Sequence, residues 1–323
     1  MFRTPQPVQK LYGIVIKIFR IGFPLLLIGA IALKLKQIGL QNLVHALPRS
    51  PMFYILQIPL FLLLPMTEKR IFSFLLGHRH TAPLMVFLRK RVLNATFIEY
   101  SGESYFYMWM TRQRELTKTQ LFHAIKDSAL LSGAAGFVVV LGAALLLFST
   151  HPDMTHALLG HLHWWAILLI FLPVLPALLL IGGNKLATQL SRQQVSIVFL
   201  LHLLRSALTF VLEGLVLYYS HTLSSLVLCY DLVTLRLVIT RIPFLPTKDM
   251  VFLWVGISAA QMLSVSQAAL AATLMMMTSI QQILDYTIVG IPWLIEHYFT
   301  KKPPQPEAIA PATPTSGPKN PPA

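Results

Sequence analysis

Apolar runs of about 20 residues recur along this chain, and they limit what it can fold into. The four clearest runs occupy residues 129–149, 163–183, 196–218 and 222–240. A helix needs about 20 mostly apolar residues to cross the hydrocarbon core of a bilayer. Charged residues make up only 12% of the chain, well below their usual share in soluble domains. A single soluble core cannot bury so many long runs, so we expect a membrane protein.

Less regular segments complete the predicted helices. Residues 11–33 form a first span that stays uncleaved, because the lead before its apolar run is long for a signal peptide. Residues 37–47 have the spacing of a short interfacial helix. A second span should run from Pro51 to about Pro65 and stop at Glu68-Lys69-Arg70. Residues 250–297 are long enough for two passes, and their polar middle could be a turn or an unwound break: Gln261, Ser264, Ser266 and Gln267.

Residues 82–111 should enter the membrane part-way and turn back. Arg89-Lys90-Arg91 separates two apolar pieces, and each cation costs roughly 2.5–3.5 kcal/mol at mid-bilayer. The predicted fold is therefore all-α: a polytopic transmembrane helix bundle of about eight helices with one or two re-entrant segments. This integral membrane domain covers residues 1–300. Residues 301–323 are rich in Pro and lack apolar periodicity, so we expect a disordered cytoplasmic tail.

The basic residues predict the topology. Lys and Arg outnumber Asp and Glu by 26 to 12, which in a soluble chain would suggest nucleic acid. Here they lie mostly between apolar runs, as the positive-inside rule requires, so we expect no nucleic acid partner. The connections 112–127, 184–192 and 241–248 are basic, whereas 150–162 has no Lys or Arg. This pattern predicts a multi-pass protein of a bacterial inner (plasma) membrane with both termini in the cytoplasm, although one outer connection carries Lys34, Lys36 and Arg49.

Charged side chains inside the predicted spans indicate a functional site, because hydrocarbon cannot solvate ions. At 100° per residue, His202 and Glu213 differ by about 20° around their helix, and Arg205 lies within about 80° of Glu213. That face must point into the bundle. A tight turn near Ser220 should bring the next helix alongside, so that Asp231 can reach Arg205 or Arg236. Two interpretations stay open: a structural ion-pair cluster, or a polar pocket for a charged head group or a coupling proton.

Two segments interrupt the apolar pattern in similar ways. FIEYSGESYFYMW places Gly102 and Glu103 between an apolar and an aromatic stretch, where the carboxylate is costly unless it is paired or at a cavity. RIPFLPTKDMVFLW places Asp249 after two prolines and before an apolar stretch. Such breaks in corresponding places of two halves indicate a transporter site. The histidines of 151–163 match no closed zinc pattern, and we predict no catalytic residue, metal or cofactor.

The order of these features resembles the transmembrane region of lysylphosphatidylglycerol synthases and the related stand-alone, flippase-like membrane proteins. Tyr100-Ser101-Gly102-Glu103, followed by Arg112, looks like the first re-entrant motif of that family. Pro243–Asp249 looks like the second, with Thr247-Lys248-Asp249 in place of its glycine-rich part. The resemblance covers roughly residues 11–297 and implies handling of an amphiphilic lipid, with Glu103, Arg112 and Asp249 at the mouth of the site. The aminoacyl transfer of the larger synthases belongs to a soluble C-terminal domain, so we do not expect this chain to be such an enzyme by itself.

The predicted function is therefore that of a flippase or lipid transporter, which moves a phospholipid, hopanoid or polyprenyl-linked substrate between leaflets. Its partners would be membrane lipids with an anionic or amphiphilic head group, and a second copy or an envelope-biosynthesis protein could join it. Two alternatives stay open: an integral-membrane transferase that uses a carboxylate such as Glu103 or Asp231, and a non-catalytic scaffold of an envelope assembly. The predicted substrate-binding residues are all charged or titratable: Glu103, Arg112, His202, Arg205, Glu213, Asp231, Arg236 and Asp249.

Overall fold

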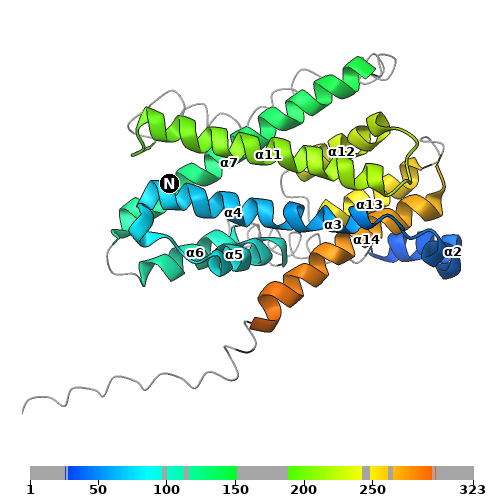
Figure 1. The fold of residues 1–323 in the computed structure, drawn as a ribbon, viewed down its shortest axis with the longest axis horizontal. Coiled ribbons are helices and arrows are strands. Elements are labelled where there is room, and N and C mark those ends of the chain that lie inside the picture. Colours follow the sequence, from blue (N-terminus) through cyan, green and yellow to red (C-terminus); the bar gives the residue numbers. More distant parts are fainter. Residues whose placement is uncertain are drawn as a thin grey trace, which may run out of the picture.

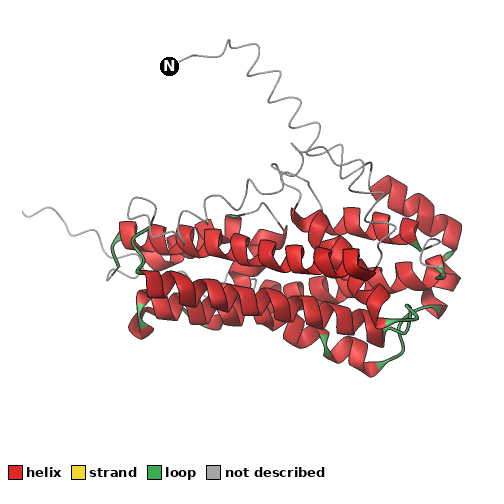
Figure 2. Cartoon of the chain, turned by 90° about the horizontal axis from the view of Figure 1, so that it is seen from above, coloured by secondary structure: helices red, strands yellow, loops and turns green. Residues whose placement is uncertain are grey.

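The computed structural model describes residues 26, 28–96, 100–112, 116–150, 188–241, 248–260, 265–292 and 295. All regular structure in these residues is helical, and Figure 2 shows helices and loops without strands there. The predicted all-α class is thus confirmed. Three of the described helical segments are long and apolar enough to cross a membrane: Pro51–Leu76, Lys118–Thr150 and Arg192–Tyr219. The predicted span 163–183, the first part of span 11–33 and the tail 301–323 lie outside the described residues.

The longest helices lie against one another in the centre of the molecule. α7 (Lys118–Thr150) packs against α11 (Arg192–Tyr219), and α4 (Gln57–Leu76), preceded by α3 (Pro51–Ile55), lies beside α11 (Figure 1). The predicted apolar runs 129–149 and 196–218 lie within α7 and α11, which confirms that both are helical. α11 begins at a capping box, in which the backbone N–H of Gln194 donates to Ser191 Oγ and that of Ser191 donates to Gln194 Oε1.

The helix does not end at Glu68-Lys69-Arg70, where the second span was predicted to stop. α4 continues through these residues to Leu76 and ends at Gly77, whose φ of 87° lies in the left-handed region that glycine favours. The Glu68 carboxylate accepts a hydrogen bond from Lys90 Nζ at 2.5 Å. Because Lys90 neutralises this charge inside the protein, the helix can continue past Glu68 without burying an unpaired carboxylate.

Within residues 82–111 two helices pack against each other as a helical hairpin, whereas the predicted part-way entry of this segment into the membrane stays a prediction. α5 (Leu84–Thr96) packs against α6 (Ser101–Thr111), and their interface contains the stacked or tilted rings of Phe87 and Phe106 together with Phe72 of α4. At 1.5 Å per residue the two helices are about 20 Å and about 17 Å long, shorter than the ~30 Å hydrocarbon core of a bilayer. Arg89-Lys90-Arg91 lies within α5.

The two helices of this hairpin approach each other closely at Gly102. A Cβ atom there would lie 2.1 Å from the backbone oxygen of Lys90, and the Gly102 N–H donates to Asn94 Oδ1 at 2.7 Å. We expect Gly102→Ala to push α6 away from α5 and to lower the free energy of unfolding by about 1–3 kcal/mol. Thermal unfolding in detergent measures this loss. Gly133→Ala on α7 is the matched control, because a Cβ there meets nothing within 4 Å. Equal losses in both variants would contradict the close packing.

A second hairpin lies near the C-terminal end of the described chain. α12 (Leu226–Arg241) follows α11, and α13 (Lys248–Ala259) packs against α14 (Gln267–Asp285), which continues as a π-helical turn, η3 (Tyr286–Gly290). Between α13 and α14, Val265 N–H donates to the Ala260 carbonyl, and Ser266 Oγ caps α14 by accepting from Ala269 N–H. Ser266 and Gln267, two of the four polar residues in the middle of 250–297, thus cap and begin the separate helix α14, whereas Gln261 and Ser264 lie outside the described residues.

The N-terminal part of the described chain packs on this second hairpin. Residues 28–38 are helical, and α2 (Leu40–His45) follows them, which confirms a short helix within 37–47. The Lys34 ammonium hydrogen-bonds to Ser258 of α13 and lies over the Trp254 ring, 5.1 Å from its centroid. Lys34 therefore lies in a helix. It is not part of the outer connection whose basic residues disagreed with the positive-inside pattern.

The long helices also expose rows of large apolar side chains. On α11, Leu200, Leu204, Leu208 and Val211 are all exposed and recur at intervals of three or four residues, so they form one stripe along the helix. Soluble monomers rarely expose large continuous apolar patches. This surface agrees with the candidate membrane spans.

Candidate functional site

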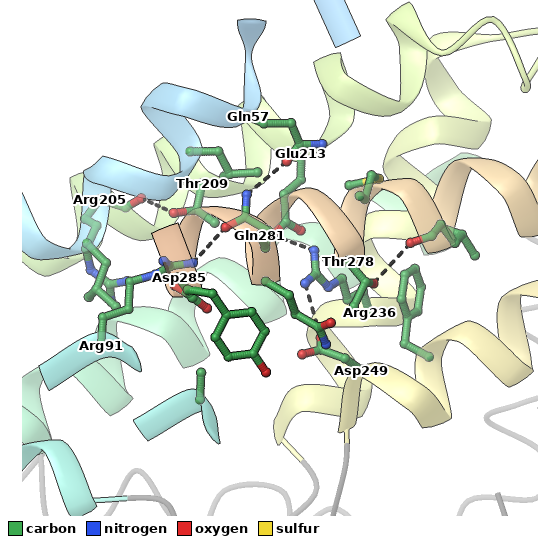
Figure 3. A pocket seen from close by; sticks show the side chains of 18 residues that line it. Gln57, Arg91, Arg205, Thr209, Glu213, Arg236, Asp249, Thr278, Gln281 and Asp285 are labelled. Carbon is green, nitrogen blue, oxygen red and sulfur yellow. Dashed lines mark hydrogen bonds and ion pairs between the residues drawn. The ribbon is translucent and has the colours of Figure 1, made fainter. Parts of the chain in front are cut away.

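A pocket of about 460 Å³ lies where α4, α5, α11, α12, α13 and α14 meet, and thus between the two hairpins (Figure 3). One part of its wall is apolar, with Leu60, Leu64, Phe252, Leu274 and Met277. The other part carries three cations and three carboxylates: Arg91, Arg205, Arg236, Glu213, Asp249 and Asp285.

Arg236 of α12 joins two carboxylates at one end of this pocket. Its Nη1 donates to Glu213 Oε1 at 2.9 Å, and its Nη2 donates to Asp249 Oδ1 at 3.2 Å. The Glu213 side chain is 10% exposed, whereas that of Asp249 is 61% exposed. We call these three residues the Arg236 group. Two carboxylates share one guanidinium, so the group has a formal charge of −1 when both are ionised.

Arg91 of α5 ties the first hairpin to the second. Its Nη1 donates to Asp285 Oδ1 and its Nη2 to Gln281 Oε1, both at 2.7 Å. Gln281 then donates to Gln57 Oε1 of α4 at 2.9 Å, and the Arg91 guanidinium lies 4.0 Å from the centroid of the Phe61 ring. These contacts occupy the planar fork of Arg91, and its charge is balanced by Asp285.

Arg205 has only neutral hydrogen-bond partners in the part of the chain that the structure describes. Its Nη2 donates to Ser132 Oγ of α7 at 3.1 Å and to Ser206 Oγ at 3.3 Å. Its Nε is buried without a hydrogen-bond partner, and so is Oε2 of Glu213 two turns further along α11. Most buried polar atoms in folded proteins are hydrogen-bonded, so an unused donor and an unused acceptor on the wall of one pocket require an explanation.

Four of the predicted site residues meet in this pocket. Arg205 and Glu213 from α11, Arg236 from α12 and Asp249 from α13 all line it. The alignment of the helices differs from the predicted one, because residues 220–225 form a loop before α12 instead of a tight turn. The ring of Tyr230 lies against Gly214, where a Cβ would come within 2.2 Å of it. Arg236 of α12 donates to Glu213, an ion pair that the predicted alignment did not name.

The other four predicted residues do not line the pocket. Glu103 lies 3.3 Å from Lys90 Nζ. The sequence predicted that a carboxylate in this aromatic segment must be paired or lie at a cavity, and Glu103 is paired. His202 is buried and shares a hydrogen bond of 3.1 Å between its Nε2 and Ser128 Oγ. Arg112 is exposed at the end of α6, and Asp231 is half-buried on α12.

A second group of buried charges lies outside the pocket lining. The Lys90 side chain is 4% exposed and sits between Glu68, at 2.5 Å, and Glu103, at 3.3 Å. Breaking a buried ion pair is strongly destabilising because it leaves an uncompensated charge. These three residues, the Lys90 group, join α4, α5 and α6. Their geometry gives Glu103 a structural role in the first hairpin.

Sequence reasoning left out several residues of the pocket wall. Arg91 was interpreted only as part of a basic triplet, and Asp285 was not among the predicted site residues. Gln281 and Asp285 are four residues apart and therefore share one face of α14. That spacing, in an otherwise apolar helix, was the available signal. Nothing in the pattern around Gln57 distinguishes it from an ordinary residue at the start of a span.

Comparison of the chain with protein-family models, with curated proteins and with solved structures finds no match. The described residues contain no group of three His, Cys, Asp or Glu side chains that could hold a metal ion. The histidines between residues 151 and 163 lie outside the described part of the chain. The fold and the site thus define a class, an all-helical protein with candidate membrane spans and a charged pocket between two helical hairpins.

Proposed function

We propose that this chain is a multi-pass membrane protein that moves or presents an amphiphilic lipid between leaflets and holds the lipid head group in the pocket. The pocket between the hairpins carries this proposal, because its wall combines six charged side chains with an apolar surface. Its volume of about 460 Å³ falls within the usual range of small-molecule sites, roughly 300–1,000 Å³. The exposed apolar stripe of α11 is a surface on which acyl chains could lie outside the pocket.

The physical basis is the solvation of charge. A charged head group that crosses hydrocarbon loses its water, and this loss is the main barrier to its movement. Arg205, Arg236 and Glu213 offer hydrogen bonds of the kind that water supplies. Arg91 holds the two hairpins together beside the pocket, so its bonds to Asp285 and Gln281 would have to rearrange if the hairpins moved apart.

The proposal includes the resemblance to the transmembrane region of lysylphosphatidylglycerol synthases. The hairpins α5–α6 and α13–α14 would be the two re-entrant elements that the resemblance implies. The chain would then be a bundle of about eight helices in the inner (plasma) membrane, with both termini in the cytoplasm. The presence of two short hairpins on either side of a charged pocket supports this arrangement.

Lipid movement can be measured with fluorescent phospholipids in proteoliposomes. We expect the wild-type chain to transfer lipid between leaflets faster than protein-free vesicles do. Glu213→Gln should slow this transfer by about tenfold or more, since a hydrogen bond to a charged group is worth roughly 1.5–3 kcal/mol. Asp231→Asn, outside the pocket lining, should stay within about twofold of wild type.

Two results would count against the proposal. If wild-type and protein-free vesicles transfer lipid equally, the transport function is lost. If wild type is active and both variants equal it, lipid moves elsewhere than through this pocket. A scaffold of an envelope assembly would give the first result while Glu213→Gln still lowered stability.

A further inference from the structure

The pocket has opposite charges at its two ends, and from this we infer the class of head group that it binds. We propose a zwitterionic head group, with a phosphate at Arg205 and a primary ammonium at Glu213 and Asp249. This inference rests on the proposed function and specifies its substrate. A phospholipid that carries a phosphate and an ethanolamine-like amine has this chemistry.

The charges of the pocket wall are separated in space. In Figure 3, Arg205 and Arg91 lie toward one side, Arg236 and Asp249 lie toward the other, and Gln281 lies between them. Asp285 balances Arg91, so Arg205 supplies the excess positive charge on its side. The Arg236 group contains one guanidinium and two carboxylates and is negative when both are ionised. A ligand with one charge of each sign matches both ends.

Arg205 retains hydrogen-bonding capacity for an anion. Among the residues that the structure describes, its Nε has no hydrogen-bond partner, and its Nη2 donates only to the hydroxyls of Ser132 and Ser206. The Glu68 carboxylate attracts Arg205 through space, but Glu68 is itself hydrogen-bonded to Lys90. A phosphate oxygen is a stronger acceptor for a guanidinium than a serine hydroxyl, so it can take over these donors.

The opposite end retains capacity for a cation with N–H donors. Oε2 of Glu213 has no hydrogen-bond partner in the described part of the chain, in a side chain that is nine-tenths buried, while Oε1 accepts from Arg236. Asp249 is largely exposed, so it offers an amine its first contact as it enters. A primary ammonium brings three donors, whereas a quaternary ammonium has none. The site should therefore prefer a primary amine.

The spacing along α11 also favours a ligand with two charges. Arg205 and Glu213 are eight residues apart, so their backbones are separated by about 12 Å along the helix axis. Thr209 lies between them on the same face and also lines the pocket. A single phosphate cannot contact both positions at once. A head group with its phosphate and its amine at opposite ends can do so.

Binding of matched lipids to the purified full chain tests this inference. The probes are phosphatidylethanolamine, phosphatidylcholine and phosphatidylglycerol with identical acyl chains, measured by native mass spectrometry or by competition. We expect phosphatidylethanolamine to bind about tenfold tighter than the other two, because it alone supplies both charges with N–H donors. Glycerophosphoethanolamine, which has the same head group without acyl chains, should compete for the site, whereas inorganic phosphate at equal concentration should not.

Two variants test which end of the pocket binds the amine and which end binds the phosphate. Glu213→Gln should abolish the preference for phosphatidylethanolamine over phosphatidylglycerol but retain binding of phosphatidylglycerol. Arg205→Gln should weaken all three lipids by about tenfold. Arg70→Gln is a matched control, because Arg70 is exposed on α4 outside the pocket lining and should bind like wild type. If Glu213→Gln does not fold, Asp249→Asn at the exposed mouth provides the same test.

Equal affinity of the wild type for all three lipids would overturn the inference, as would a preference that survives both Glu213→Gln and Asp249→Asn. Competition by inorganic phosphate equal to that of glycerophosphoethanolamine would also overturn it, because a simple anion site would then suffice. In each of these cases lipid transfer by the wild type could continue, so the proposed function would stand. If the wild type neither binds nor transfers lipid, both the inferred head group and the proposed function are wrong.

Discussion

Arg236→Met should lower the free energy of unfolding by about 3–5 kcal/mol and abolish lipid transfer. The substitution removes the only hydrogen-bond partner that the structure describes for the buried Glu213 carboxylate, and an uncompensated buried charge has a cost of this size. Asp249 should contribute little to the loss, because it is mostly exposed and water can replace Arg236 there. Chemical or thermal unfolding in detergent measures the effect on stability.

The double variant Arg236→Met with Glu213→Met separates stability from function. Apolar side chains of similar volume can replace a buried ion pair at little or no cost, so the double variant should recover most of the lost stability. It should not recover lipid transfer, because the charges that hold the head group are gone. A double variant less stable than Arg236→Met alone would contradict the pairing of Arg236 with Glu213. A double variant with normal transfer would contradict the role of the pair in lipid binding.

Lys90→Met should be destabilising to a similar degree, about 3–5 kcal/mol, for the same physical reason. Lys90 is buried between Glu68 and Glu103, and without it these carboxylates have lost their shared cation. The loss should appear as a lower unfolding temperature, and the first hairpin should become more susceptible to proteolysis because the Lys90 group joins α4, α5 and α6.

Lys69→Met is the matched control for this prediction. Lys69 is the neighbour of Glu68 on α4, but its half-buried side chain lines a different hollow, together with Phe74 and His78. Substitutions away from buried ion pairs usually change stability by no more than about 0.5 kcal/mol. If Lys90→Met and Lys69→Met unfold at the same temperature, the buried ion pairs do not hold the hairpin.

The helices could be predicted where the apolar pattern is long and uninterrupted. The runs in α7 and α11 are rich in Leu, Val and Ala over the length of a membrane span, so both helices were found. Their ends could not be predicted in the same way. α4 passes through Glu68 because Lys90, 22 residues away in the sequence, neutralises it, and no local pattern contains that information.

The candidate site was predictable to the extent that charge in an apolar segment is unusual. This criterion found Arg205, Glu213 and Arg236, and the interrupted pattern after Pro243 found Asp249. It missed the part played by Arg91, because three adjacent cations look alike in the sequence although Lys90 and Arg91 have different carboxylate partners. It also named Asp231 as the neighbour of Arg205 or Arg236 and did not pair Arg236 with Glu213, since that pairing depends on the length of the loop before α12.

Photocrosslinking with a phospholipid that carries a diazirine in its head group tests most directly whether this pocket holds a lipid. The full chain is reconstituted in vesicles, irradiated, digested and analysed by mass spectrometry. We predict adducts on pocket residues such as Met277, Thr278 and Tyr286, which excess unlabelled lipid suppresses and which Arg236→Met with Glu213→Met removes. Adducts confined to the outer faces of α7 and α11, with the pocket residues unmodified, would contradict the account.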